Sequence, residues 1–183
     1  MIIGITGTIA AGKGTIVEIL QKKGFTHYSA RDYLTKELLA QQKPINRDEM
    51  RKLADFLRET KGPDIVIRSL FEMAQQKGGD VIIESVRSLG EVTFLEKQSD
   101  FHLLGVDADI KTRYERAIKR GTETDKIDFN TFVSQNEKEN SGRTPFSGNI
   151  LGCIQKADIL INNDGTIEEL EKNVQAVLDK ISN

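Results

Sequence analysis

The sequence predicts an α/β fold in which a doubly wound parallel sheet is covered by helices on both faces. Two observations lead to this class. Short apolar runs typical of strands alternate with amphipathic helical segments, and the first such run leads directly into a glycine-rich turn and a helix. A chain of 183 residues, 38% hydrophobic and 30% charged, has the size and composition of one globular domain. We therefore expect one domain with insertions and no second core.

The elements follow one another in a regular order. We expect strands at residues 2–6, 25–29, 80–84, 101–107 and 158–161. We expect helices at residues 12–23, 30–42, 47–59, 63–76, 88–97, 109–120 and 167–181. The excess length between the second and third strands predicts a small helical insertion at about residues 30–79. Residues 121–147 are polar and too long for a minimal connection, so we interpret them as a mobile lid and not as a core element.

The connection between the first strand and the first helix has the pattern of a phosphate-binding loop. Its residues are Gly7, Thr8, Ile9, Ala10, Ala11, Gly12, Lys13, Gly14 and Thr15. They fit G-x-x-x-x-G-K-[ST] with one glycine inserted before the threonine. Converging backbone N–H groups and the dipole of the following helix attract phosphates. Lys13 is expected to neutralise the β- and γ-phosphates of a nucleoside triphosphate, and Thr15 to ligate Mg²⁺. The alternative is a tight turn with a solvated lysine.

Polar side chains follow the second and third strands at the sheet edge where α/β proteins bind ligands. Arg31 and Asp32 come after the second strand, while Glu84 and Arg87 come at the end of the third. A guanine-reading segment would need a lysine after the last strand, and residues 162–165 lack it. We therefore expect ATP in preference to GTP.

These segments resemble the nucleoside-monophosphate kinase superfamily, specifically adenylate-kinase-like and dephospho-coenzyme-A-kinase-like proteins. The resemblance covers most of the chain and implies a sheet of strand order 2-3-1-4-5, ATP and Mg²⁺ as ligands, and phosphoryl transfer to a small phosphorylated acceptor. Ser29, Asp32 and Leu34 match the family's acceptor-binding segment. Thr35 stands where the family has an arginine, and Arg31 is a candidate replacement.

The acceptor itself stays open between two classes. A nucleoside or deoxynucleoside monophosphate would attack through its phosphate, which is already a nucleophile near neutral pH. Dephospho-coenzyme A would attack through a ribose hydroxyl, which benefits from a general base. The candidates for acceptor binding are Arg31, Asp32 and Arg87.

The resemblance also implies a donor site. Arg116 and Arg120 match two family arginines that contact the donor nucleotide and the transferring phosphates, although a solvated helix face is the other interpretation. Asp164 and Gly165 belong to a segment resembling the loop that backs the adenine. The implied nucleotide-binding set is Gly7, Ala10, Ala11, Gly12, Lys13, Gly14, Thr15, Arg116, Asp164 and Gly165. Arg143, in the expected lid, is either a catalytic clamp that arrives on closure or an exposed loop arginine.

Two carboxylates are catalytic candidates with a plainer alternative each. Glu84 would orient a Mg²⁺-bound water or accept a proton from an acceptor hydroxyl, or it would form a salt bridge with Arg87. Asp32 would act as a general base, or it is an acid at a helix N-terminus. The catalytic set is therefore Lys13, Arg120, Arg143, Asp32 and Glu84.

A further group of arginines lies on one side of the helix expected at residues 47–59. Arg47, Arg51 and Arg58 would attract a phosphorylated acceptor, but Asp55 lies four residues after Arg51 and three before Arg58. We therefore interpret these arginines as a salt-bridged solvent face.

Charge and composition exclude other classes. A formal net charge of −2, from 26 basic and 28 acidic residues, argues against a nucleic-acid-binding surface. No apolar run is long enough to span a bilayer, no secretory signal is visible, and Cys153 has no partner for a disulfide, so we expect a cytoplasmic protein. An ATPase or nucleotide-responsive interaction protein remains the alternative, with Thr35 as its support. The sequence does not indicate an oligomeric state.

Overall fold

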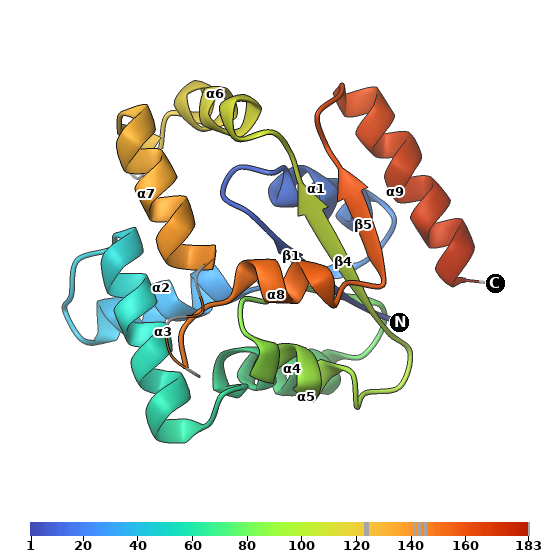
Figure 1. Cartoon of the computed structure of the whole chain (residues 1–183). Helices are drawn as coiled ribbons and strands as arrows, with labels where there is room; N and C mark the ends of the chain where they lie inside the picture. Colours follow the sequence, from blue (N-terminus) through green and yellow to red (C-terminus); the bar gives the residue numbers. More distant parts are fainter. Residues whose placement is uncertain (123–124, 141, 143, 145, 183) are drawn as a thin grey trace.

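A computed structural model describes residues 1–122, 125–140, 142, 144 and 146–182. Its centre is a five-stranded parallel sheet in the order β2-β3-β1-β4-β5, which confirms the predicted fold class (Figure 1). The strands are β1 (Ile2–Gly7), β2 (Thr26–Ser29), β3 (Val81–Glu84), β4 (Phe101–Asp107) and β5 (Ile159–Asn162). The helices are α1 (Lys13–Lys22), α2 (Ala30–Ala40), α3 (Arg47–Lys61), α4 (Ile65–Lys77), α5 (Leu89–Leu95), α6 (Ile110–Arg120), α7 (Phe129–Asn140), α8 (Ile150–Gln155) and α9 (Ile167–Ile181).

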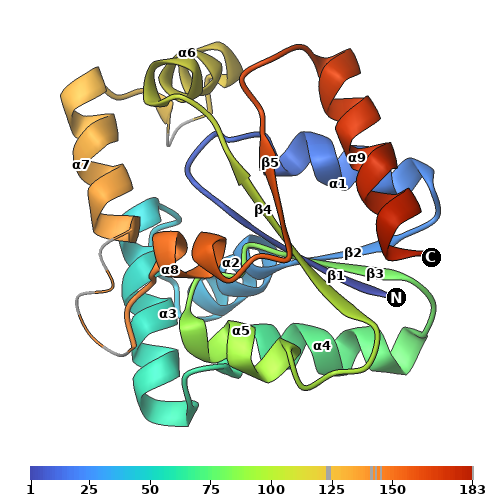
Figure 2. The same cartoon turned by 45° about the vertical axis from the view of Figure 1, so that its right-hand side comes forward.

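Both faces of the sheet are buried, because the strands are apolar at consecutive positions and side chains alternate between faces. Ile83 and Leu103 belong to one hydrophobic cluster, and their neighbours Ile82 and Leu104 belong to another. Helices α1 and α9 cover the second cluster, while α4, α5 and α8 pack on the opposite face (Figure 2). None of the described helices is long and apolar enough to cross a membrane.

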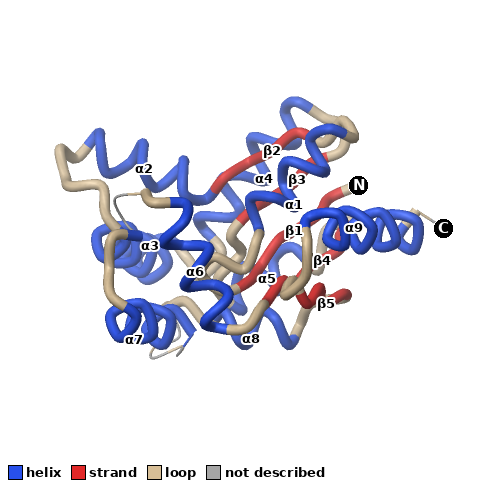
Figure 3. Tube along the Cα trace, turned by 90° about the horizontal axis from the view of Figure 1, so that it is seen from above, coloured by secondary structure: helices blue, strands red, loops and turns tan. Residues whose placement is uncertain are grey.

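The excess chain between β2 and β3 forms α2, α3 and α4, as its length predicted. These helices pack on one another, and α2 and α4 also contact β2. Seen from above, α3 lies at the same end of the molecule as α6 and α7, far from α9 (Figure 3). The α3 part of the insertion therefore lies toward the end of the sheet at which β1 leads into the phosphate-binding loop.

Two helices differ from the sequence-based expectation. Residues 121–147, expected to lack a core element, contain α7, and its Phe132 is only 1% exposed because it packs against Ile9 and Ala117. Helix α8 was not expected either; Asn149 caps it by accepting a hydrogen bond from the Gly152 N–H at 2.9 Å. α8 is short and α7 is largely polar, so neither shows a strong periodic pattern, and α7 is buried only through distant contacts.

Candidate active site

The phosphate-binding loop has the backbone conformation that its glycines predict. Gly12 has φ +107°, and a Cβ at this position would lie 2.2 Å from the amide nitrogen of Asn163, so a larger residue fits neither the conformation nor the space. The same Asn163 amide donates a hydrogen bond to the Ala11 carbonyl at 2.8 Å. The loop after β5 thus holds the phosphate-binding loop in shape.

Lys13 is folded back onto its own loop. Its Nζ donates to the carbonyl oxygens of Gly7 and Thr8, each at 2.7 Å. Burial, reinforced by the nearby Arg87 guanidinium, lowers the pKa of Lys13 to about 8. A phosphate would offer this ammonium a full negative charge in place of two neutral carbonyls.

Arg116 fixes the loop that follows β5. Its guanidinium donates to the carbonyls of Asn163 at 2.6 Å and Gly165 at 3.2 Å, and all three residues line the cleft described below. Asp164 does not line the cleft, and it accepts a hydrogen bond from the Asp109 N–H at 2.7 Å. Within the expected adenine loop, Gly165 and not Asp164 therefore faces the space where a nucleotide would bind.

Arg113 is a structural residue of the site that the sequence did not reveal. It is 5% exposed and donates to the carbonyl of Ile9 at 3.2 Å and to the side-chain oxygen of Asn136 at 2.8 Å. Its Nε also donates to the carbonyl of Ala108 at 2.8 Å. Arg113 thereby joins the phosphate-binding loop to α6 and α7. Because Asn136 lies on a helix that was not expected, no local pattern indicated this contact.

Glu84 is paired with a histidine of the neighbouring strand. Its carboxylate lies 3.1 Å from Nε2 of His27 on the neighbouring strand, and Glu84 lines the cleft. Burial by itself would raise the pKa of Glu84, but the His27 hydrogen bond and the Lys13 ammonium hold it below its ordinary value. The alternative of a Glu84–Arg87 salt bridge is wrong, because Arg87 pairs with Glu139 instead.

Two carboxylates of residues 121–147 form ion pairs with three arginines of the cleft. Glu139 pairs with Arg87 and lies 3.7 Å from Arg47. Asp125, 1% exposed, accepts from Arg47 at 3.1 Å and from two nitrogens of Arg120 at 2.8 and 2.9 Å. Burial opposes ionisation of both acids, yet the arginines hold the pKa of Glu139 and that of Asp125 below their ordinary values. This network joins α7 to the insertion and to the end of β3.

The arginine face of α3 is not a solvent face, so that interpretation was wrong. Arg47, Arg51 and Arg58 all line the cleft, and Arg58 is only 3% exposed. The expected pair of Arg58 with Asp55 is present at 3.2 Å, whereas Arg51 pairs with Asp48 at 2.9 Å. The helix is turned so that its basic residues face inward because Leu53 and Leu57 anchor its other side in the core.

Helix α2 presents one of its two predicted site residues to the cleft. Arg31 lines the cleft, but Asp32 is exposed and does not, and its backbone N–H donates to the Ser29 side chain at 3.2 Å. Thr35, where the resembling family has an arginine, does not line the cleft either. Arg143 lies outside the described residues, so its predicted role stays a prediction.

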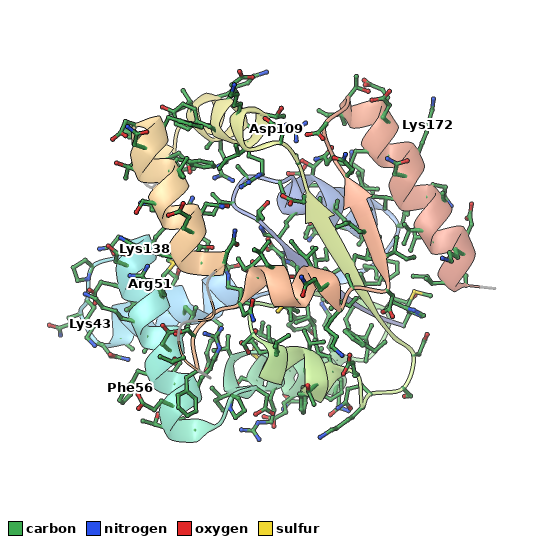
Figure 4. All side chains as sticks on the ribbon, in the orientation of Figure 1. Lys43, Arg51, Phe56, Asp109, Lys138 and Lys172 are labelled. Atoms are coloured by element: carbon green, nitrogen blue, oxygen red, sulfur yellow. The ribbon has the colours of Figure 1, made fainter. Side chains whose placement is uncertain are left out.

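The Lys13, Arg116, Glu84 and Glu139 side chains line one cleft with a cavity volume of about 830 Å³. We call two parts of it the loop side and the insertion side. The loop side is lined by Ile9, Ala10, Ala11, Gly12, Lys13, Gly14, Thr15, Arg116, Asn163 and Gly165. The insertion side is lined by Arg31, Leu34, Arg47, Met50, Arg51, Ala54, Asp55, Arg58, Val66 and Arg87. Lys138 of α7 lines the cleft as well, and Figure 4 shows it together with Arg51 of α3.

The residues present suit a Mg²⁺ ion that is held mainly by phosphate oxygens. The described residues contain no cluster of three or more His, Cys, Asp or Glu side chains able to hold a metal. The Thr15 hydroxyl and the Glu84 carboxylate both line the cleft, and both are the hard oxygen ligands that Mg²⁺ prefers.

Sheet order, loop and cleft together define a P-loop protein with the fold of small-molecule kinases. Residues 3–142 match a family described as AAA domain, and the chain belongs to this family. The chain is also 30% identical to a UPF0200 protein of Methanococcus maripaludis over 185 aligned residues, covering 100% of this chain and 98% of the relative, so it belongs to the UPF0200 proteins.

Two solved structures share the fold. One is a shikimate kinase from Bacteroides thetaiotaomicron, with TM-score 0.59, 16% identity and 98% of each chain covered. The other is a dephospho-CoA kinase from Campylobacter jejuni, with TM-score 0.54, 15% identity, and 98% of this chain and 96% of the other covered. At these identities the likeness establishes the fold alone.

Proposed function

We propose that the protein transfers the γ-phosphoryl group of ATP to a small phosphorylated acceptor, either a nucleoside or deoxynucleoside monophosphate or dephospho-coenzyme A. The observation that carries this proposal is the single cleft that joins the phosphate-binding loop to the arginine-rich insertion side. A nucleotide hydrolase needs only the first part, whereas a transferase needs a second binding site next to the γ-phosphate.

Each part of the proposed site has a defined task. The loop side binds the triphosphate. Mg²⁺ held by Thr15 would neutralise charge on the phosphates. Glu84 would orient a metal-bound water or accept a proton from a hydroxyl acceptor. Lys13 stabilises the negative charge that moves with the transferred phosphoryl group. Arg87 and Arg31 bind the acceptor's phosphate. Arg120 would stabilise the transition state after it exchanges Asp125 for phosphate oxygens.

The segment at residues 121–147 is proposed to close the site against water. Its carboxylates Asp125 and Glu139 already pair with arginines of the cleft, which is where phosphates would compete with them. Exclusion of water would favour transfer over hydrolysis.

The decisive experiment is a screen of nucleoside monophosphates, deoxynucleotides and dephospho-coenzyme A with ATP and Mg²⁺, in which the phosphorylated acceptor is separated by chromatography and identified by mass. We expect one acceptor class to give product, and the Lys13→Ala protein to give none. ADP formation without any phosphorylated acceptor would instead favour the alternative of an ATPase or nucleotide-responsive interaction protein.

The threonine at position 35, where the resembling family has an arginine, gives little support to the alternative of an ATPase or interaction protein. Thr35 does not line the cleft, while Arg31, one helical turn earlier, does. The guanidinium is therefore available from a different position on α2.

A further inference from the structure

Ser85, the first residue after β3, has a backbone conformation that serine rarely adopts. Its φ is +72°, in the left-handed region, where a Cβ crowds the following carbonyl oxygen. Among the described residues, three other non-glycine residues have positive φ: Ala10, Gln42 and Asp100. Gln42 and Asp100 are exposed and Ala10 belongs to the phosphate-binding loop, whereas Ser85 is the buried member of the group, with an exposed fraction of 7%. The strain at Ser85 is therefore not that of a surface turn.

The neighbouring strand β1 fixes this conformation. The backbone N–H groups of Ser85 and Val86 both donate to the carbonyl oxygen of Ile5, at 2.9 and 3.0 Å. Two successive N–H groups converge on one oxygen because the chain turns at Ser85. Glycine would make the same turn without strain, since it has no Cβ. The fold thus explains the turn, but it does not explain why the residue there is a serine.

The hydroxyl of Ser85 is not used by the fold. It has no hydrogen-bond partner among the described residues. It is also not one of their unpaired side-chain atoms that are sealed from water, of which Thr6 Oγ1 is an example. Ser85 lines the cleft, so the small part of it that stays accessible belongs to the cleft wall. The hydroxyl is therefore available to a ligand in the cleft.

Ser85 lies close to the group expected to bind phosphate. Its backbone partner Ile5 belongs to the strand that leads into the phosphate-binding loop. The Glu84 carboxylate and the Arg87 guanidinium, on either side of Ser85 in the chain, both interact electrostatically with the Lys13 ammonium. An anion bound by Lys13 would therefore lie next to the segment that carries the unused hydroxyl.

We propose that the Ser85 hydroxyl donates a hydrogen bond to a phosphate oxygen of a ligand bound next to Lys13, and that this contact explains a serine where glycine would be less strained. Ionised phosphate oxygens only accept hydrogen bonds, and a hydroxyl supplies a donor without adding a further positive charge beside Lys13 and Arg87. The oxygen belongs to the γ-phosphate of the donor or to the phosphate of the acceptor. This inference rests on the proposed function, because it adds a contact to the same site.

The test compares the wild type with Ser85→Ala and Ser85→Gly, which both remove the hydroxyl. Calorimetry measures the affinity for a non-hydrolysable ATP analogue, for ADP, and for AMP and dephospho-coenzyme A in the presence of the analogue. If the oxygen belongs to the γ-phosphate, both variants should bind the analogue about ten- to a hundredfold more weakly and ADP as the wild type does. If it belongs to the acceptor, the affinity for both donor nucleotides should stay unchanged and that for the acceptor should fall by the same factor.

Melting temperatures separate this contact from a structural role. Ser85→Gly should melt a few degrees above Ser85→Ala, because only glycine relieves the strain, although both variants lose the same affinity. Ser69→Ala is the control for the hydroxyl: Ser69 is half-buried, donates to the Ile65 carbonyl at 2.8 Å and does not line the cleft. Gln42→Gly is the control for the strain, because Gln42 is exposed and lies outside the cleft lining. Neither control should change the affinity for any of the ligands.

The outcomes distinguish this inference from the proposed function. A selective loss of analogue affinity in both Ser85 variants supports the inference even if no acceptor is phosphorylated, a result that would overturn the proposed function alone. Wild-type affinity for every ligand in both variants overturns the inference and leaves the proposed function standing. A loss in Ser85→Ala that Ser85→Gly does not share also overturns it, because the defect would then come from the backbone. Failure of the wild type to bind any of these ligands overturns both.

Discussion

The loop side and the insertion side of the cleft are built in opposite ways. On the loop side, Lys13 contacts carbonyls five and six residues earlier, and most cleft-lining groups belong to one short segment. On the insertion side, Arg58 meets Glu91 across 33 positions of the chain, and Arg47 meets Asp125 across 78. A local loop can form a phosphate site in many proteins, whereas a site assembled from distant ion pairs depends on how the whole domain packs.

Breaking a distant pair should produce the largest effect. Glu91→Ala leaves the buried Arg58 guanidinium without its main partner and removes a cap of α5, so we expect a loss of about 3–5 kcal/mol in the free energy of unfolding. Denaturant unfolding measures it. The control is Asp48→Ala, which breaks an exposed pair within α3 and should cost less than about 1 kcal/mol. Equal losses in the two variants would show that the insertion side is no more dependent on tertiary packing than a surface helix.

On the loop side, the corresponding change should affect turnover and not stability. Lys13→Ala should reduce phosphoryl transfer by at least about a hundred- to a thousandfold, the scale of one lost preorganised contact to the transition state. The pKa of Lys13 is lower in the folded than in the unfolded chain, so charged Lys13 opposes folding at neutral pH and its removal should not lower the melting temperature. Wild-type turnover would refute the loop as the donor site.

Arg120 lies on the same helix as Arg116 of the loop side and shares Asp125 with Arg47 of the insertion side, and Arg120→Lys tests which side it serves. Lysine keeps the charge but loses the planar fork that now holds both oxygens of Asp125. We expect turnover to fall by roughly ten- to a thousandfold, with a smaller change in ATP-analogue affinity. A lower melting temperature with unchanged turnover would assign Arg120 to anchoring Asp125 and not to the transition state.

A milder change tests whether residues 121–147 act as a lid. Glu139→Gln weakens the contacts of α7 with Arg87 and Arg47, so amide hydrogen exchange within Phe129–Asn140 should become about tenfold faster in the free protein. Glu137→Gln is the control, because Glu137 is exposed on the same helix and does not line the cleft. The wild-type segment should be protected further when ATP analogue and acceptor are both bound. Equal exchange in the free protein and in every complex would identify a static segment.

The smallest expected effect is the uptake of a fraction of a proton when an ATP analogue binds. The free protein loses the Lys13 proton as pH rises through about 8, and bound phosphate restores it. Binding of an ATP analogue at about pH 8.5 should therefore take up roughly half a proton or more, and little at about pH 7. Calorimetry in buffers of different ionisation enthalpy measures this uptake, and Lys13→Met should abolish its pH dependence. Identical uptake by the variant would place the titrating group elsewhere.

The sequence alone determined the fold and most of the loop side. Strand and helix periodicity are local properties, and the positions of α1 to α6 and α9 agreed with them to within a few residues. The loop motif can also be recognised from local sequence, because a strand, a glycine-rich turn and a helix must follow one another for backbone N–H groups to converge. Four predicted arginines line the cleft because they follow strands or lie on a helix at the ligand-binding edge of the sheet: Arg31, Arg87, Arg116 and Arg120.

Only the tertiary structure decided which charges meet. Glu84 pairs with His27 and not Arg87, since the parallel register places Ser29 beside Glu84 and brings β2 side chains to the end of β3. The inward face of α3, the burial of Phe132 and the role of Arg113 likewise depend on contacts between segments far apart in sequence. Ion pairing requires only opposite charge and proximity, and a sequence states the first while the packed fold alone supplies the second.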